Sequence, residues 1–251
     1  MEIINSKKDP LEQGGLRLVP ESAVLETPKL EKQFVNFMFF RVHPEWRKLN
    51  SETKAIYKEE FRSIYEQFRE HFLLFSYSLV GFDSKADLML WRIGKSLDLI
   101  QEMTAKLYRT NLGGFFETAD TYLSITKKRI FVTNSIEDRT HVNAGEKKYL
   151  FVYPCAKNRE WYEKTDEERD HLIEENFMVG KRFSNIKIHM THAFGFGEQE
   201  YIISFETDEP RDFLALAEEL RETPASKFTL RGMPIYTCRQ KSIEECLDAL
   251  G

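Results

Sequence analysis

The sequence predicts an α+β protein made of two copies of one β-α-β-β-α-β unit, and two observations lead to this prediction. The first is internal similarity, because Leu74–Trp91 (LFSYSLVGFDSKADLMLW) matches Ile188–Phe205 (IHMTHAFGFGEQEYIISF) at an offset of 114 residues. Gly81 aligns with Gly195 in this match, which places a glycine turn in each copy. The second is that strand and helix periodicities alternate in the same order in both halves. Several repeats in register indicate duplication rather than chance.

The first strand and first helix of each half repeat at nearly the same offset. Phe34–Phe40 (FVNFMFF) matches Tyr149–Tyr153 (YLFVY), and both are short apolar runs typical of strands. Ser51–Arg69 matches Thr165–Phe183. Each of these opens with Ser or Thr followed by acidic residues, which is the chemistry that satisfies the first amides of a helix.

The remaining elements follow in the same order. We expect second helices at Ser96–Tyr108 and Pro210–Glu222, the latter with proline in its first turn. Last strands are expected at Phe115–Thr126 and Lys227–Cys238, and a C-terminal helix at Ser242–Leu250. This order is ferredoxin-like, and two such units can pair their sheets into a barrel.

The repeat also sets the expected domain organisation. Residues 1–30 lie before it and are polar, so we expect an N-terminal extension there. Residues 31–145 form the N-terminal ferredoxin-like half. Residues 146–251 form the C-terminal half, which we expect to hold the ligand pocket.

Composition excludes several classes of function. Hydrophobic residues make up 41% and charged residues 31%, the balance of a folded protein rather than a disordered one. The net charge of −5 is mild and Lys/Arg do not cluster, so we expect no nucleic-acid partner. The longest apolar run, Phe34–Phe40, is too short to span a membrane. Residues 1–30 do not resemble a signal peptide, and Cys155, Cys238 and Cys246 do not have the spacing of a metal site. We therefore expect a cytoplasmic protein with reduced thiols.

Motifs along almost the whole chain after residue 30 carry a family resemblance. They are FVNFMFFRVHPEWRKL, LGGFFETADTYLSIT, YLFVYPCAKNREWY and the run from THAFGFG to FET. In order and spacing they resemble the chlorite dismutase / coproheme decarboxylase family. The resemblance implies a dimeric α+β barrel of two ferredoxin-like halves, usually assembled as a pentameric ring, which binds heme or coproheme in its C-terminal half.

The segment Val152–Lys157 (VYPCAK) is similar to the decarboxylase branch of that family. There the tyrosine forms the radical that attacks a propionate and the lysine holds that propionate, which implies these roles for Tyr153 and Lys157. Lys181 and Arg221 stand where that branch has further propionate-binding cations. The alternative is that Tyr153 is a strand-end aromatic residue and that all three cations are solvated surface charges.

The pattern breaks at the residue that ligates iron. The family's axial histidine matches Asn176, in a register supported by the following Gly180–Lys181 pair. An amide is a poor ligand for heme iron, for which imidazole is a usual one. The glutamate that supports this histidine in chlorite dismutases matches Ala225. No arginine stands near Ile188, where the chlorite-splitting branch has one, so chlorite dismutation is the least expected activity.

Other side chains could in principle replace the missing ligand. His189 and His192 lie on one predicted strand and point to opposite faces, so one of them could face the pocket. His171 lies five residues before Asn176 on the same helix, which rotates it away by about 140°. For each histidine, a surface or hydrogen-bonded role is the competing interpretation. We therefore assign no metal ligand.

Three hypotheses follow. The most favoured is peroxide-dependent oxidative decarboxylation of coproheme, with Tyr153 as the radical relay, Asn176 at the axial position, and Lys157, Lys181 and Arg221 holding the porphyrin. The partners implied are a porphyrin, hydrogen peroxide and further copies of the chain. The alternative is a non-catalytic member that binds a porphyrin, weakly or not at all, or another anionic ligand, or acts as a structural oligomer. A third is a different enzyme that uses the Cys155 thiol.

Overall fold

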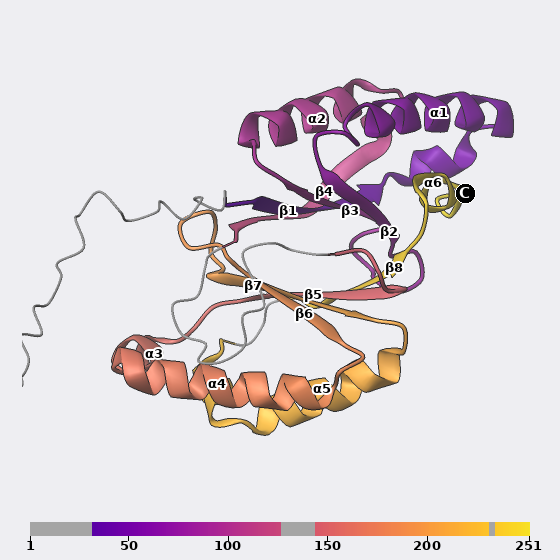
Figure 1. Ribbon diagram of the computed structural model, residues 1–251. Coiled ribbons are helices and arrows are strands. Elements are labelled where there is room, and N and C mark those ends of the chain that lie inside the picture. Colours follow the sequence, from indigo (N-terminus) through magenta and orange to yellow (C-terminus); the bar gives the residue numbers. More distant parts are fainter. Residues whose placement is uncertain (1–31, 127–143, 231–233) are drawn as a thin grey trace, which may run out of the picture. The chain divides into compact units, whose positions relative to one another are not determined.

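The computed structural model describes residues 32–126, 144–230 and 234–251 (Figure 1), so the predicted extension at 1–30 lies outside the described residues. The elements in chain order are β1 (Phe34–Val42), the 3-10 helix η2 (Pro44–Lys48), α1 (Ser51–Gln67), β2 (Leu73–Ser78), β3 (Leu88–Gly94), α2 (Leu97–Arg109), η3 (Gly113–Phe115), β4 (Phe116–Ile125), β5 (Tyr149–Cys155), α3 (Arg159–Tyr162), α4 (Asp166–Arg182), β6 (Lys187–His192), β7 (Tyr201–Thr207), α5 (Pro210–Glu222), η4 (Pro224–Phe228), β8 (Tyr236–Gln240) and α6 (Ile243–Asp248). The predicted β-α-β-β-α-β order is present twice.

The eight strands close into a barrel in the order β1-β3-β2-β8-β5-β7-β6-β4. The two halves meet at two short antiparallel seams, β2 with β8 and β4 with β6. Helices α1 and α2 cover the outer side of the N-terminal strands, and α4 and α5 cover the outer side of the C-terminal strands (Figure 1). The predicted fold class, an α+β barrel of two ferredoxin-like repeats, is confirmed. No helix in the described ranges is long and apolar enough to cross a membrane.

Local chemistry explains where the first helices and the turns form. α4 begins with a capping box, in which Thr165 Oγ1 accepts from the Glu168 amide at 3.2 Å and Glu168 Oε2 accepts from the Thr165 amide at 2.8 Å. In α1 the cap is Asn50, one residue before the predicted Ser51. Gly81 and Gly195 have φ angles of 82° and 80°, which favour glycine, so the paired glycine turns are confirmed.

Two details of the sequence alignment were wrong. Phe75 pairs with Trp91 in the first half and His189 with Ser204 in the second, so Trp91 corresponds to Ser204 rather than to Phe205. The reason is that residues 79–87 link the paired ends of the first hairpin, whereas the shorter run 193–200 links those of the second. The last strand also begins at Tyr236 rather than at Lys227, because Lys227 and Phe228 belong to η4 and Pro234, which cannot donate a ladder hydrogen bond, stands just before the strand.

Candidate functional site

Helix α4 packs against the sheet differently from its counterpart α1. Each has 17 residues, but α1 buries Phe61 and Tyr65 whereas Gly180 is the one buried residue of α4. Their N-caps, Asn50 and Thr165, are 115 residues apart. At that offset Asn176 corresponds to Phe61 and Gly180 to Tyr65. In the N-terminal half these two positions hold buried aromatic side chains. In the C-terminal half they hold the smaller side chains of asparagine and glycine.

Three cross-strand rows of β5, β7 and β6 form the surface that faces α4 and α5. From the pairing of the strands, the first row is Phe151–Phe205–Ile188, the second is Tyr153–Ile203–Met190, and the third is Cys155–Tyr201–His192. Two side chains of the first row, Phe151 and Phe205, are buried, and Phe151 stacks on Phe213 of α5 with ring centroids 3.8 Å apart, whereas Ile188 is exposed. All three side chains of the second row are only half-buried.

Helix and strand spacings counted from the contact between Gly180 and Ile188 place Asn176 near the second row. Ile188 Cδ1 is 2.9 Å from where a Cβ on Gly180 would lie, so glycine lets α4 approach the first row closely. One turn back along α4, about 6 Å, brings Asn176 opposite Met190, which is about 6–7 Å along β6 from Ile188. Asn176 Oδ1 is buried and has no hydrogen-bond partner among the described residues. An unpaired buried acceptor costs about 1–3 kcal/mol, so this position favours a ligand or water that donates a hydrogen bond.

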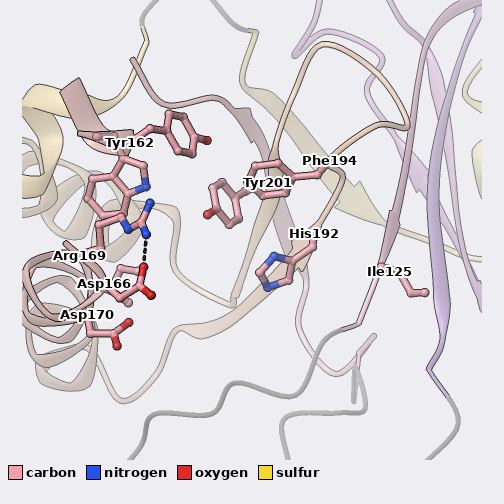
Figure 2. Close-up of a pocket in the computed structure, with 10 residues that line it drawn as sticks. Ile125, Tyr162, Asp166, Arg169, Asp170, His192, Phe194 and Tyr201 are labelled. Atoms are coloured by element: carbon pink, nitrogen blue, oxygen red, sulfur yellow. Dashed lines mark hydrogen bonds and ion pairs between the residues drawn. The ribbon is translucent and has the colours of Figure 1, made fainter. Parts of the chain in front are cut away.

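A cavity of about 550 Å³ opens at the third row (Figure 2), within the size range of small-molecule sites. Its lining residues are Ile125, Trp161, Tyr162, Asp166, Arg169, Asp170, Ile173, His192, Phe194 and Tyr201. Figure 2 shows His192 and Tyr201 projecting from the sheet toward the α4 residues Asp166, Arg169 and Asp170. Four of the ten lining residues are aromatic, namely Trp161, Tyr162, Phe194 and Tyr201, and such rings can stack on a flat conjugated ligand.

The charges on the cavity wall do not favour a small anion. Arg169 is paired with Asp166 on the same helix, and Asp170 adds a second carboxylate. Partial burial, followed by a hydrogen bond to Glu200, raises the pKa of the Tyr162 phenol, so this group stays neutral at physiological pH. One cation against two carboxylates leaves the described wall without excess positive charge.

Tyr153 and Lys157 both lie near this space. Tyr153 is in the second row, half-buried beside the cluster that contains Phe151. Lys157 is held by the protein itself, because its Nζ donates to Thr229 Oγ1 at 2.8 Å and lies 4.7 Å from the centre of the Trp161 ring. Burial lowers the pKa of Lys157. In this structure the lysine supports a wall of the cavity rather than projecting into it.

Lys181 and Arg221 do not line the cavity. They are exposed in the last turns of α4 and α5, and the Lys181 ammonium lies 4.8 Å from the centre of the Phe177 ring. Ala225 is buried in η4, which packs against α4. Its methyl group therefore stands where the resemblance to chlorite dismutases would place a glutamate carboxylate.

The histidines separate as strand alternation predicts. His189 points into the barrel, where its Nε2 is 2.8 Å from Glu206 Oε1 and its ring meets Trp91 edge-on. His192 points outward and lines the cavity. His171 is exposed on α4, with Nε2 3.4 Å from Glu175 Oε1. Nowhere in the described ranges do three His, Cys, Asp or Glu side chains converge to hold a metal ion.

Comparison with known proteins agrees with this architecture. A family model described as chlorite dismutase matches residues 35–241. The chain belongs to the chlorite dismutase family. It is 27% identical to a coproheme decarboxylase from Mycolicibacterium smegmatis over 180 residues, which cover 69% of this chain and 75% of the relative. It is 22% identical to a chlorite dismutase from Ideonella dechloratans over 243 residues, covering 92% and 84%.

Solved structures of the family superpose well on this chain. A mutant chlorite dismutase from Candidatus Nitrospira defluvii matches with a TM-score of 0.79 and 25% identity, covering 86% of this chain and 94% of that one. A protein described as a putative chlorite dismutase matches at 18% identity with a TM-score of 0.74, which shows the shared fold alone.

The residues present suit the flat macrocycle of an iron porphyrin, but α4 does not suit its iron. The cavity leaves room for a flat ligand beside the N-terminal part of α4, and Asn176 Oδ1 is an acceptor without a described partner on the same helix. The inner face of α4 does not offer an imidazole to iron, because Asn176 faces the sheet and His171 faces solvent.

Sequence reasoning missed most of the cavity wall, including Trp161, Tyr162 and Tyr201. One signal was present, because the α4 residues of the wall, Asp166, Arg169, Asp170 and Ile173, recur at helical spacing and so share a face of α4. The aromatic residues come from three separate elements, and no local pattern links them.

Proposed function

We propose that this member of the chlorite dismutase family binds coproheme between α4, α5 and the second and third rows, and decarboxylates it oxidatively with hydrogen peroxide. The observation that carries the proposal is the cavity of about 550 Å³ between the N-terminal part of α4 and the strand ends that carry His192 and Tyr201. The similarity to coproheme decarboxylases supports the choice of substrate.

The reaction balances as one peroxide for each propionate. A propionate, one hydrogen peroxide and one proton give a vinyl group, carbon dioxide and two water molecules. The substrate's iron supplies the oxidising chemistry once peroxide is present. The protein then needs a group that can take a hydrogen atom from the propionate side chain, and a cation to hold the carboxylate.

Tyr153 is the residue we assign to the hydrogen-atom step. Its phenol is half-buried in the second row, the row that lies opposite Asn176. For carboxylate binding, exposed Lys181 and Arg221 lie at the ends of the two helices that cover this space. Lys157 would exchange its bond to Thr229 for the charge-assisted bond that a carboxylate offers, which is the stronger of the two.

The test is titration of the purified protein with coproheme and with heme b, followed by peroxide. We expect a Soret band with coproheme and loss of carboxyl groups by mass spectrometry. Tyr153→Phe should keep the band and lose the decarboxylation. Tyr149→Phe, the same change on the same strand, should keep both, because Tyr149 accepts a hydrogen bond from Arg239 at 2.8 Å away from the second row. No spectral change with either porphyrin would overturn the proposal.

The second candidate function is porphyrin binding without catalysis. It is favoured by Asn176 and Ala225, which together leave the inner side of α4 without an imidazole or the carboxylate that would support it. A stable coproheme complex that keeps all its carboxylates after peroxide is added would select this function.

A further inference from the structure

We infer that residues 144–148 form a strap that closes one end of the barrel interior, and that Glu206, backed by His189, is the anchor that holds the strap shut. The strap is the stretch of chain just before β5, and its opening would let water and small molecules into the interior. None of the residues that line the cavity beside α4 belongs to the strap, so this role does not depend on the proposed function.

The anchor is a carboxylate with no exposed surface. Glu206 Oε2 accepts from the amide of Gly145 at 2.9 Å and from that of Glu146 at 3.2 Å. Glu206 Oε1 lies 2.8 Å from His189 Nε2. Hydrogen bonds to an ionised acceptor are stronger than those between neutral groups, and a buried carboxylate is costly without them. The strap and the carboxylate therefore stabilise each other.

The other charged contacts of the strap lie at its solvent-exposed rim. Lys147 pairs with Asp208 at 3.0 Å, and Glu146 pairs with Lys187 at 2.9 Å. Both carboxylates have about half of their side chains exposed, with fractions of 48% for Asp208 and 57% for Glu146. Exposed ion pairs contribute little to stability, because water screens them. The buried anchor should therefore dominate the closure of the strap.

The N-terminal half lacks this anchor. In the register of the two hairpins, Glu206 corresponds to Ile93 and His189 corresponds to Phe75. Ile93 is a buried apolar residue with no charge to satisfy. A buried carboxylate–imidazole pair is no more stabilising than apolar side chains that fill the same space. Its presence beside the strap thus points to a role in holding the strap rather than in packing the barrel.

Gly145 sets how closely the strap approaches the barrel. Its φ angle of 83° lies in the region that favours glycine. A Cβ at this position would lie 2.0 Å from Phe75 Cε1. The neighbouring Ala144 packs against the hydrophobic cluster of the barrel interior. The strap therefore fits the end of the barrel only with glycine at position 145.

The interior beneath the strap contains polar groups that water would satisfy. Trp91 Nε1 and the Tyr77 hydroxyl are buried and have no hydrogen-bond partner among the described residues. The ring of Trp91 lies 5.8 Å from that of His189 and 6.4 Å from that of Tyr77, so these groups lie close to the anchor. An unpaired buried donor costs free energy, which water entering past an open strap would recover. The interior thus favours opening, and the anchor opposes it.

Cys238 can report whether the interior is open. Its thiol is buried in the same cluster as Trp91, two residues before Gln240, whose Nε2 donates to the Gly145 carbonyl oxygen at 3.0 Å. Burial raises the pKa of the Cys238 thiol, so in the closed protein this group is protonated and unreactive. Cys246 is also buried, but in the separate cluster of the N-terminal half, and serves as an internal control.

The experiment measures how fast iodoacetamide labels each cysteine of the full chain, together with hydrogen–deuterium exchange of the peptide that contains residues 144–148. Glu206→Gln keeps the size of the side chain but replaces one acceptor oxygen with an amino group. We expect it to label Cys238 at least about tenfold faster and to exchange the strap amides faster, because local opening becomes more frequent. Labelling of Cys246 should stay at the wild-type rate.

Gly145→Ala tests the strap without changing the anchor. The added methyl group would collide with Phe75, so this variant should also label Cys238 faster. Gly195→Ala is the matched control, because Gly195 has a similar φ angle of 80° but nothing within 4 Å of an added Cβ. It should label Cys238 at the wild-type rate.

Three results would count against the strap. Equal acceleration at Cys238 and Cys246 would show global unfolding and overturn the inference. Wild-type labelling of Cys238 in both Glu206→Gln and Gly145→Ala would overturn it as well. Acceleration in Gly145→Ala but not in Glu206→Gln would overturn the role of Glu206 as the anchor.

Discussion

The two halves share one unit but differ in how its helices meet its sheet. In the N-terminal half the middle row under the helices, Met38–Leu90–Ser76, is buried, with exposed fractions of 5%, 0% and 4%. The corresponding row in the C-terminal half, which contains Tyr153, is half-buried throughout. The strands are paired in the same way, so side chains rather than backbone decide whether this space is filled.

The helices show the same contrast. Phe61 packs against Phe116 with ring centroids 5.4 Å apart, and Tyr65 donates a hydrogen bond to the Leu74 carbonyl oxygen at 3.3 Å. α4 makes no such insertion, since Gly180 is its one buried residue. The comparison teaches that one copy serves as a packed scaffold while the other keeps room for a ligand.

The largest loss of stability should come from removing a buried aromatic side chain in the N-terminal half. Phe61→Ala removes a fully buried ring and should lower the free energy of unfolding by about 3–5 kcal/mol. Asn176→Ala, at the corresponding position, should change it by about 1 kcal/mol or less, because an unpaired buried acceptor is removed. Urea unfolding of both variants measures the difference. Equal losses would contradict the contrast between the halves.

The next largest effect should be a loss of coproheme affinity when a large side chain is placed on α4 in the C-terminal half. Asn176→Phe places in α4 the residue that α1 has, and should weaken coproheme binding by at least about a hundredfold, or about 2.7 kcal/mol. Met178→Phe, on the exposed side of the same helix, should bind as wild type does. Both are checked by coproheme titration and thermal unfolding. Normal binding by a folded Asn176→Phe would show that the ligand lies elsewhere.

A third prediction concerns the strand end of the third row. Burial raises the pKa of the Cys155 thiol from 9.0 to about 11. Because the folded pKa lies above the unfolded one, the stability that this group contributes is present below pH 9 and is lost as the pH rises toward 11. Across that range the unfolding free energy of wild type should fall by about 2–3 kcal/mol more than that of Cys155→Ala. If the unfolding free energies of wild type and Cys155→Ala change with pH in the same way, the thiol is exposed to solvent and this prediction is wrong.

The smallest effect should come from restoring the histidine that the family resemblance led us to expect. Asn176→His presents an imidazole from the helix wall and should tighten coproheme binding by about tenfold, or about 1.4 kcal/mol. His171→Asn is the control on the exposed side of α4. The measurement is the titration midpoint together with the ligation spectrum. No change in either would contradict the placement of Asn176 over the bound iron.

Much of the fold could be predicted because its signals are local. The order of strands and helices follows from periodicity and caps, and the paired turns follow from Gly81 and Gly195. The residue of the second half that corresponds to Trp91 could not be predicted. The two hairpin connections differ in length by one residue, and the aligned glycines hide this difference. The start of β8 was also missed, although Pro224 at the start of η4 and Pro234 just before β8 are local signals against a strand there.

The site was less predictable because it depends on tertiary pairing. Tyr153 and Asn176 were both singled out by resemblance, but their placement on opposite walls follows from how α4 lies over β6. Likewise, nothing in the sequence shows that Lys157 bonds to Thr229, which is distant in the chain.

The most direct test of the central claim is hydrogen–deuterium exchange of the protein with and without coproheme. If the ligand lies under α4, amides of α4 and of the strands carrying the second and third rows should gain protection, while those of α1 should not change. Protection that appears in α1, or none in α4 at coproheme concentrations that produce the Soret band, would contradict the account.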